Sequence, residues 1–168
     1  MPPHEPTERE LKYSLVDPPP READLLAAAG AGPYAFVPFG TAVHVDRYFD
    51  DDDASLAAAG VALRRREADG ATIATLKTLG TVAGARHERE ELEAPMHGDD
   101  WPVPVARRLA EHVALWQLRP RVELTTERTS YRVVHEGRPV AVLAFDEVRA
   151  RLPEGAREAL FAEAEVEA

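Results

Sequence analysis

Charged side chains spaced two residues apart are the feature of this sequence best suited to chemistry. Residues two apart in a β-strand share one face, so each such set presents its charges on a single side of a strand. The sets are Glu8, Glu10 and Lys12; Arg64 and Arg66; Arg89, Glu91 and Glu93; and Glu163, Glu165 and Glu167. Carboxylates supply the oxygen ligands that a divalent metal ion prefers, and cationic side chains attract a polyanion. The pattern therefore suits a site that binds a polyanion together with a divalent metal.

Two interpretations of these charged faces fit the pattern. In an ordinary barrel the inward face is apolar, which would place the charges in water. The opposite faces, such as that of Leu11, Tyr13 and Leu15, are nevertheless apolar enough to need covering, and short helices can cover them from outside. The barrel would then enclose a charged lumen. We favour this second interpretation because the charges also segregate by strand into glutamate groups and Arg/Lys groups.

The elements that would position these side chains are mostly strands. The pairs Asp69-Gly70 and Glu136-Gly137 each predict a tight hairpin turn, so their flanking strands should be antiparallel neighbours. Eight strands are predicted, over residues 7–16, 41–50, 61–68, 71–78, 85–94, 121–135, 140–149 and 159–167. The sequence therefore predicts a mainly β (α+β) fold, an eight-stranded antiparallel β-barrel with few helices.

Three short helices fit between these strands, over residues 20–29, 53–59 and 105–117. The first two each end at a glycine that suits a helix C-cap, Gly30 and Gly60. The third places Val105, Leu109, Val113 and Trp116 on one face at helical spacing, so that face should pack on the sheet. All three helices are expected to lie outside the barrel.

Composition narrows the function further. The 168 residues are 45% hydrophobic and fit one domain spanning 1–168. The formal net charge of −10 opposes binding to nucleic acid or to anionic lipid. The sequence has no cysteine for a disulfide, no membrane-length apolar run and no signal-peptide pattern at its start. We therefore expect a cytoplasmic protein with a small-molecule partner, and the oligomeric state stays open.

Other possible sites carry less weight. The four aspartates at 50–53 precede a predicted helix, where they are expected to cap its N-terminus rather than to bind metal. The six histidines show no zinc-site spacing, and no glycine-rich segment has the pattern of a nucleotide loop. Trp101 and Trp116 are expected to be packing residues.

The order of motifs along the chain resembles one known family. Glu8-Arg9-Glu10-Leu11-Lys12 resembles the ExExK signature that opens CYTH domains, the triphosphate tunnel metalloenzymes. Further segments that match in order are 46–50, 63–66, 75–77, 89–95, 126–129, 145–148 and 161–167. ExExK alone is a weak signal, but this ordered set covers nearly the whole chain.

The resemblance implies an eight-stranded tunnel whose interior binds a triphosphate and a divalent metal, Mg²⁺ or Mn²⁺. The residues that it implies for triphosphate or polyphosphate binding are Lys12, Arg64, Arg66, Lys77, Arg89 and Arg128. Those implied as metal ligands are Glu8, Glu10, Asp146, Glu165 and Glu167, with Glu91, Glu93 and Glu163 as possible additional acidic residues. Lys12, Glu8 and Glu10 are expected to take part in catalysis.

The expected activity is metal-dependent hydrolysis of the terminal phosphate of inorganic triphosphate or a small organic triphosphate. The mechanism would be in-line attack by a positioned water on the terminal phosphorus. Lys12 would either hold charge or take a proton, and its neighbours push its pKa in opposite directions. The alternatives are a noncatalytic polyphosphate- or nucleotide-binding module, and an adenylyl cyclase or thiamine triphosphatase of the same fold.

Two departures from the family pattern bear on the site. Thr126 stands where many relatives have a basic residue, two positions before Arg128, so one phosphate contact is either missing or supplied by Arg89. The fifth strand also has two possible charged faces, because Arg86, Glu88 and Glu90 alternate just as Arg89, Glu91 and Glu93 do. We prefer the second set, because residues 91–95 are more similar to the family segment.

Overall fold

The computed structural model describes residues 7–15, 22–30, 32–78, 81–83, 86–153, 155 and 157–168. Within these ranges, the side chains of residues 7–10, 25, 29, 81–83 and 86–90 lie outside the description. In chain order the elements are β1 (Thr7–Leu15), α1 (Glu22–Ala29), β2 (Tyr34–Asp50), α2 (Ser55–Ala58), β3 (Val61–Ala68), β4 (Ala71–Thr78), β5 (Thr81–Ala83), β6 (Arg86–Pro95), α3 (Val103–Leu109), η1 (Leu115–Gln117, a 3₁₀ turn), β7 (Arg119–His135), β8 (Arg138–Arg151) and β9 (Glu158–Glu167).

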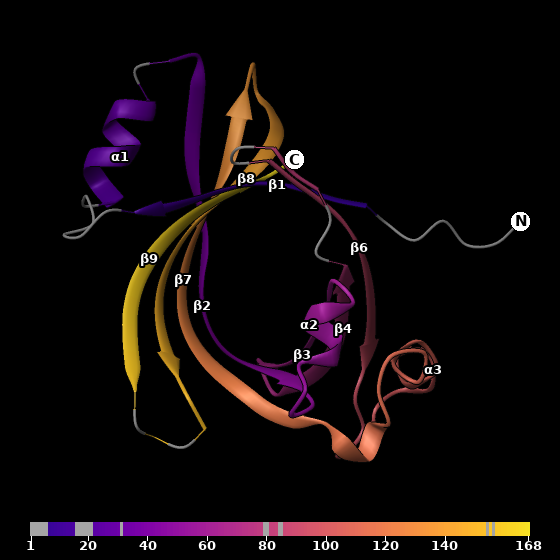
Figure 1. Cartoon of the computed structure of the whole chain (residues 1–168). Helices are drawn as coiled ribbons and strands as arrows, with labels where there is room; N and C mark the ends of the chain where they lie inside the picture. Colours follow the sequence, from indigo (N-terminus) through magenta and orange to yellow (C-terminus); the bar gives the residue numbers. More distant parts are fainter. Residues whose placement is uncertain are drawn as a thin grey trace, which may run out of the picture.

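All strand pairs are antiparallel, and their order is β1-β9-β8-β7-β2-β3-β4-β6-β5. β1 also pairs with β6, so the strands surround a central lumen (Figure 1). The predicted antiparallel tunnel fold is confirmed. The strand that the sequence analysis missed is β5, three residues that pair with β6 alone.

The hydrophobic core lies outside the lumen, between the sheet and the helices. Leu63 and Leu76 are buried on the faces of β3 and β4 that point away from the charged residues. α2 and α3 cover these faces with Leu56, Val105 and Leu109. Full burial of each such side chain contributes roughly 1.5–3 kcal/mol, so this outer layer is a major source of stability. The polar faces of the same strands are left to line the lumen.

The third helix differs from the prediction at its C-terminal end. It spans Val103–Leu109, with η1 following as a separate turn, instead of one helix over 105–117. Val105, Leu109 and Val113 are buried as expected, but Trp116 is 76% exposed. Its predicted packing role is wrong, because the change to a 3₁₀ turn breaks the helical phase that would have aligned it. Trp101 does pack, with its ring edge-on to Phe49 at 5.0 Å.

Two of the four aspartates at 50–53 cap α2 as predicted. Asp50 accepts hydrogen bonds from the backbone N–H groups of Leu56 and Ala57, at 2.9 and 3.1 Å. Asp51 accepts from both the backbone and the hydroxyl of Ser55. These bonds satisfy N–H groups that have no partner inside the helix, and they anchor the connection from β2 to β3. No helix in the described ranges is long and apolar enough to cross a bilayer.

Candidate functional site

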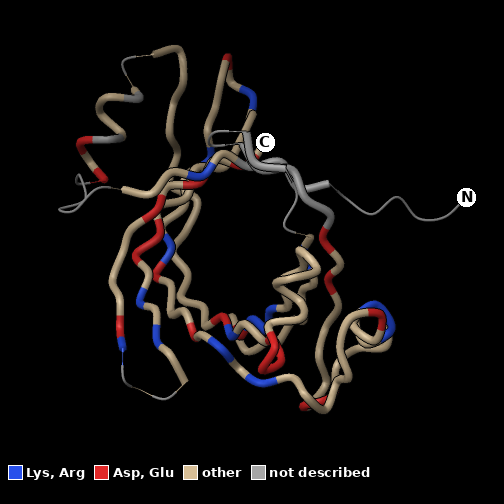
Figure 2. Tube along the Cα trace, in the orientation of Figure 1, with Lys and Arg blue, Asp and Glu red and all other residues tan. Residues whose placement is uncertain are grey.

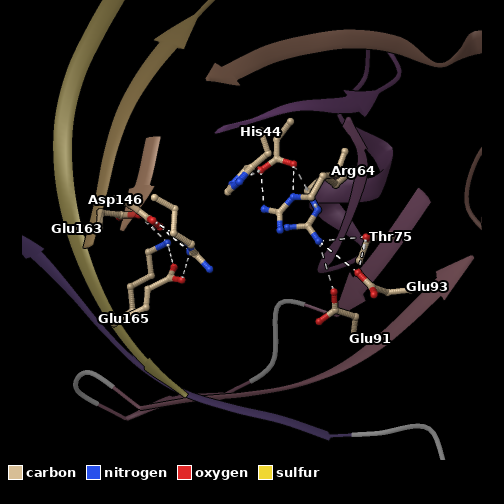
Figure 3. Close-up of polar contacts among 12 residues, drawn as sticks. His44, Arg64, Thr75, Glu91, Glu93, Asp146, Glu163 and Glu165 are labelled. Carbon is tan, nitrogen blue, oxygen red and sulfur yellow. Dashed lines mark hydrogen bonds and ion pairs between the residues drawn. The ribbon is translucent and has the colours of Figure 1, made fainter. Parts of the chain in front are cut away.

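Two groups of charged side chains face each other across the lumen, and Figure 3 shows both. The first, which we call the arginine cluster, comes from β2, β3, β4 and β6 and consists of His44, Asp46, Arg64, Arg66, Thr75, Lys77, Glu91 and Glu93. The second, the acidic cluster, comes from β1, β7, β8 and β9 and consists of Lys12, Arg128, Asp146, Glu163 and Glu165. Figure 2 shows acidic and basic residues interspersed along the strands that supply them.

Arg66 is held by a two-pronged ion pair inside the arginine cluster. Its Nε and Nη2 atoms donate to the two carboxylate oxygens of Asp46, each at 2.7 Å. The two residues are direct cross-strand partners on β2 and β3, so the pair follows from the register of these strands. Asp46 is buried, and the ion pair with Arg66 offsets the free-energy cost of removing its carboxylate from water.

Arg64 is only partly satisfied. Its Nη2 donates to Thr75 Oγ1 at 3.1 Å and lies 3.4 Å and 3.6 Å from carboxylate oxygens of Glu93 and Glu91. The Nε atom lies 3.9 Å from an oxygen of Asp46, which is too far for a hydrogen bond, and has no hydrogen-bond partner although it is buried. A buried N–H without a partner is costly, and Arg65, whose side chain lies outside the lumen, has the same feature at its own Nε.

The acidic cluster links three carboxylates to two cations. The ammonium of Lys12 contacts carboxylate oxygens of Glu163 at 2.6 Å and Glu165 at 2.8 Å. Arg128 donates two hydrogen bonds to Asp146 and a third to the other oxygen of Glu165. Glu165 therefore bridges the two cations. Three carboxylates against two cations leave this cluster with an excess of negative charge, as a divalent metal would require.

The surroundings of Lys12 make it a charge holder rather than a base. Burial lowers the pKa of Lys12, but the charge of Glu165 and hydrogen bonds to Glu163 and Glu165 raise it more, so the net pKa lies above its ordinary value. Lys12 is therefore protonated at neutral pH. Of the two roles left open by the sequence, this electrostatic environment favours the one in which Lys12 supplies charge.

Two carboxylates in the lumen make stability pH-dependent. Burial raises the pKa of Asp46, but its ion pair with Arg66 outweighs burial, so the pKa lies below its ordinary value of 3.8. Burial likewise raises the pKa of Glu165, but its ion pairs with Lys12 and Arg128 outweigh burial, so this pKa lies below its ordinary value of 4.5. A lowered pKa in the folded state stabilises the protein above the ordinary pKa, and this contribution is lost as the pH falls through the folded-state value.

The free energy of unfolding is therefore expected to fall as the pH drops below about 4.5, because Asp46 and Glu165 must then be protonated. Urea unfolding at a series of pH values between 6 and 3 measures this dependence. Asp46→Asn and Glu165→Gln should each make the free energy of unfolding vary less steeply with pH. Glu147→Gln, at an exposed position, should leave its slope unchanged. Equal slopes in all four proteins would contradict the assignment.

Sequence reasoning missed three residues of the site, Thr75 on β4 and His44 and Asp46 on β2. The two residues of β2 alternate with Tyr48, and this spacing places them on the face that carries Arg66. His44 is buried, with Nε2 3.8 Å from an oxygen of Asp46, and burial together with Arg66 lowers its pKa. The alternation in residues 44–48 could have indicated that these side chains share one strand face. It was passed over because a pattern of repeated charges does not include histidine and tyrosine.

The structure brings most of the remaining predicted residues to the lumen. Lys77 forms an ion pair with Glu91 at 2.9 Å, and the two are cross-strand partners. Glu91 and Glu93 both belong to the arginine cluster, which agrees with the preferred face of the fifth predicted strand. Glu167 is exposed at the end of β9 and makes no ion pair with any residue that the structure describes.

Three predicted site residues, Glu8, Glu10 and Arg89, have side chains outside the described part of the structure. Their backbones are placed. Glu8 pairs with Arg89, and Glu10 pairs with Glu167. The same strand, β1, carries Lys12, whose contacts lie in the lumen. Their roles stay predictions.

The acidic cluster fits a divalent metal by its donor chemistry. Asp146, Glu163 and Glu165 offer only carboxylate oxygens, the ligands that Mg²⁺ and Mn²⁺ take. Among the described residues, no three acidic or histidine side chains are already grouped as a metal site. The carboxylates are instead turned to Lys12 and Arg128, so metal binding requires them to exchange these cations for the ion.

Comparison with known proteins identifies the relatives of this arrangement. A protein from Hippeastrum, provisionally assigned as an adenylyl cyclase and described as having a dominant triphosphatase activity, superposes with a TM-score of 0.67 at 20% identity, over 96% of this chain and 79% of the other. A provisionally assigned adenylate cyclase from Bacillus halodurans superposes with a TM-score of 0.57 at 19% identity, over 96% of this chain and 81% of the other.

A protein from Pyrococcus horikoshii has a TM-score of 0.54 at 21% identity, over 94% of this chain and 76% of the other. Likeness at this level of identity establishes the fold. No curated protein matches the sequence significantly. The CYTH domain family, in contrast, matches residues 7–168, which is nearly the entire chain. By this match, and by the charged lumen that its strands enclose, the chain belongs to the CYTH domain family.

Proposed function

We propose that the lumen binds a triphosphate and, with a divalent cation, hydrolyses its terminal phosphate. The observation that carries the proposal is the pairing of an arginine cluster, in which Arg64 has a buried Nε without a hydrogen-bond partner, with a separate acidic cluster that has excess carboxylate. Guanidinium groups bind phosphate oxygens in pairs, and carboxylates hold Mg²⁺ or Mn²⁺. The triphosphatase activity described for the Hippeastrum relative supports the same assignment.

The chain's own residues have distinct roles in this mechanism. Arg64 and Arg66 hold phosphate oxygens on one side of the lumen, with Lys77 next to them. Arg128 and Lys12 approach the phosphate chain from the opposite side once their carboxylates turn away. A bound Mg²⁺ or Mn²⁺ supplies charge neutralisation on the phosphate oxygens. Holding the phosphate chain between two walls also orients the terminal phosphorus for in-line attack by water.

The carboxylates of the acidic cluster are the groups that hold the metal and orient the attacking water. Asp146 and Glu165 are the strongest candidates, because both form ion pairs with Arg128 and face the lumen. Glu163 is adjacent to them through Lys12. Glu8, Glu10 and Glu167 would add ligands at the end of the lumen where β1 and β9 pair.

Phosphate release from inorganic triphosphate, ATP and thiamine triphosphate tests this proposal directly, with Mg²⁺, Mn²⁺ or EDTA and with calorimetric binding of each compound. Metal-dependent release from any of them is the expected result. Tight binding without release in either metal would replace the enzyme by a polyphosphate- or nucleotide-binding module. Pyrophosphate release from ATP without orthophosphate would instead favour a cyclase.

Lys12→Arg is expected to keep metal-dependent turnover within about tenfold of the wild type, because a guanidinium also supplies positive charge here. Lys12→Ala should lose more, because Glu163 and Glu165 would then lack a cation and the phosphate would lose a contact. Steady-state kinetics on the two variants measure this difference. Loss of turnover in Lys12→Arg as complete as in Lys12→Ala would point to proton transfer by the lysine.

A further inference from the structure

Three strands extend beyond the end of β9 and form an arm at one end of the lumen. The pairing of β9 with β8 stops at Glu167 and Val142, while β2, β7 and β8 continue together past this point (Figure 1). The arm consists of residues 34–40 of β2, 130–135 of β7 and 138–144 of β8. Its base, at residues 130–132 and 142–144, is level with the last residues of β9, and the rest lies past them. The second predicted strand began at residue 41, so this part of β2 lay outside the prediction.

One face of the arm continues the phosphate-binding face of the lumen. Arg128, Ser130 and Arg132 alternate along β7 and therefore share a face. Arg132 lies four residues beyond Arg128, or about 13 Å along an extended strand. The other face is the covered one, because Val133 is buried there and the hydroxyl of Tyr131 donates a hydrogen bond to Glu22 of α1.

The open face carries an aromatic ring with a guanidinium above it. The Cζ atom of Arg132 lies 4.8 Å from the centroid of the Phe39 ring. Phe39 is the extra residue of a bulge in β2, between Pro38 and Gly40, which lets its side chain reach the side of Arg132. The ring is nevertheless 57% exposed.

Arg132 also differs from the cations of the lumen in its partners. Arg64, Arg66, Lys77, Arg128 and Lys12 all lie within 4.0 Å of a carboxylate oxygen. Arg132, in contrast, has no acidic group within ion-pair distance in the part of the chain that the structure describes. Its guanidinium instead makes a cation–π contact with the ring of Phe39. Its charge therefore adds to the attraction for an anionic ligand without first having to be released from a carboxylate.

We propose that Phe39 and Arg132 form a stacking site for the planar base of a nucleoside triphosphate whose phosphates occupy the lumen. The inference rests on the proposed function, because it needs phosphates beside Arg128. Aromatic rings and guanidinium planes both stack on nucleobases, and the stacking tolerates any base. A bare polyphosphate would not use the ring, and a cationic heterocycle such as the thiazolium of thiamine would be repelled by Arg132. The arm thus favours nucleotides among organic triphosphates.

Calorimetric binding of two ligands tests the stacking site, with inorganic triphosphate and an ATP analogue that has an imido bridge between its terminal phosphates, both in EDTA. Phe39→Ala should weaken binding of the nucleotide about tenfold, since one stacked base contributes roughly this much, and leave binding of triphosphate within twofold. Phe39→Tyr should restore nucleotide binding. Val43→Ala is the matched control. Val43 is a similarly exposed apolar residue of β2 (59%), but it lies on the strand face opposite the one that lines the lumen.

Each other outcome overturns the inference in a recognisable way. Equal weakening of both ligands by Phe39→Ala would make the arm a structural support of the lumen. No weakening of either ligand, or binding of triphosphate without any binding of the nucleotide, would remove the stacking site and leave the proposed function intact. Failure of the wild-type protein to bind either ligand, in EDTA and also with Mg²⁺, would overturn the proposed function itself.

Discussion

Replacing Arg64 and Arg66 together with alanine is expected to weaken triphosphate binding by at least about a hundredfold. Arg64 is buried and Arg66 is partly buried, and removing one partner of a buried charged hydrogen bond costs roughly 2–5 kcal/mol. Arg64 has the additional feature of a buried Nε without a hydrogen-bond partner. In the proposed complex this Nε donates to a phosphate oxygen, so the substitution removes that contact as well. Calorimetry with inorganic triphosphate in EDTA measures the effect without interference from the metal.

Arg65→Ala is the control for this experiment. Arg65 stands between the two arginines on β3, but its side chain pairs with Glu67 and Asp99, away from the lumen. Its replacement should leave triphosphate binding within about threefold of the wild type. The alanine pair also leaves the buried Asp46 without Arg66, which destabilises the fold. A second variant, Arg66→Ala with Asp46→Asn, removes both charges and keeps the comparison valid. Unchanged affinity in folded variants would place the phosphate site elsewhere.

Replacing Asp146 with asparagine and Glu165 with glutamine is expected to lower metal-dependent turnover by at least about a hundredfold. A metal ion supplies several kcal/mol of transition-state stabilisation, and each 1.4 kcal/mol corresponds to about tenfold in rate. The same variant should bind triphosphate in EDTA as well as the wild type or more tightly, because Arg128 loses both of its carboxylate partners. Opposite effects on turnover and on metal-free binding are a signature that misfolding would not produce.

Glu147→Gln is the control, because Glu147 follows Asp146 in β8 but is exposed on the opposite face. It should change neither turnover nor binding. Titration with Mn²⁺, followed by its electron paramagnetic resonance signal, gives a readout independent of activity. The double variant should lose Mn²⁺ binding that Glu147→Gln keeps. Full Mn²⁺ binding in the double variant would assign the metal to other carboxylates, with Glu8 and Glu10 as the first to test.

The ion pairs within the lumen bear on how its two proposed ligands, a divalent metal and a triphosphate, would affect one another's binding. Arg66, Lys77, Arg128 and Lys12 are all paired with carboxylates. A metal that takes up Asp146 and Glu165 releases Arg128 for phosphate, and a phosphate that takes up Arg128 releases the same carboxylates for metal. The two ligands should therefore bind with positive coupling, which by linkage is equal in both directions. Pairing of the cations in the absence of ligand also keeps the buried charges compensated.

Much of the fold and part of the site could be predicted because local sequence carries them. Alternation along 8–12 and 64–66 requires strands with one charged face, and Asp69-Gly70 requires a hairpin. The aspartates at 50–53 cap a helix because they lie next to its free N–H groups. The order of these motifs identified the family, which matches residues 7–168. All of these features depend on residues close together in the chain.

The charge pattern in the sequence favoured a charged lumen, but only the tertiary structure showed which elements enforce that choice and which charges meet there. Both faces of an alternating strand can be inside, and the choice was made by α2 and α3, which cover Leu63 and Leu76 from outside. Lys12 and Glu165 meet although they are 153 residues apart, because β1 pairs with β9. Contacts of this range depend on strand order and register, which local patterns do not contain. The same reason explains why Asp46 joined the site unpredicted and why Phe39 reached Arg132.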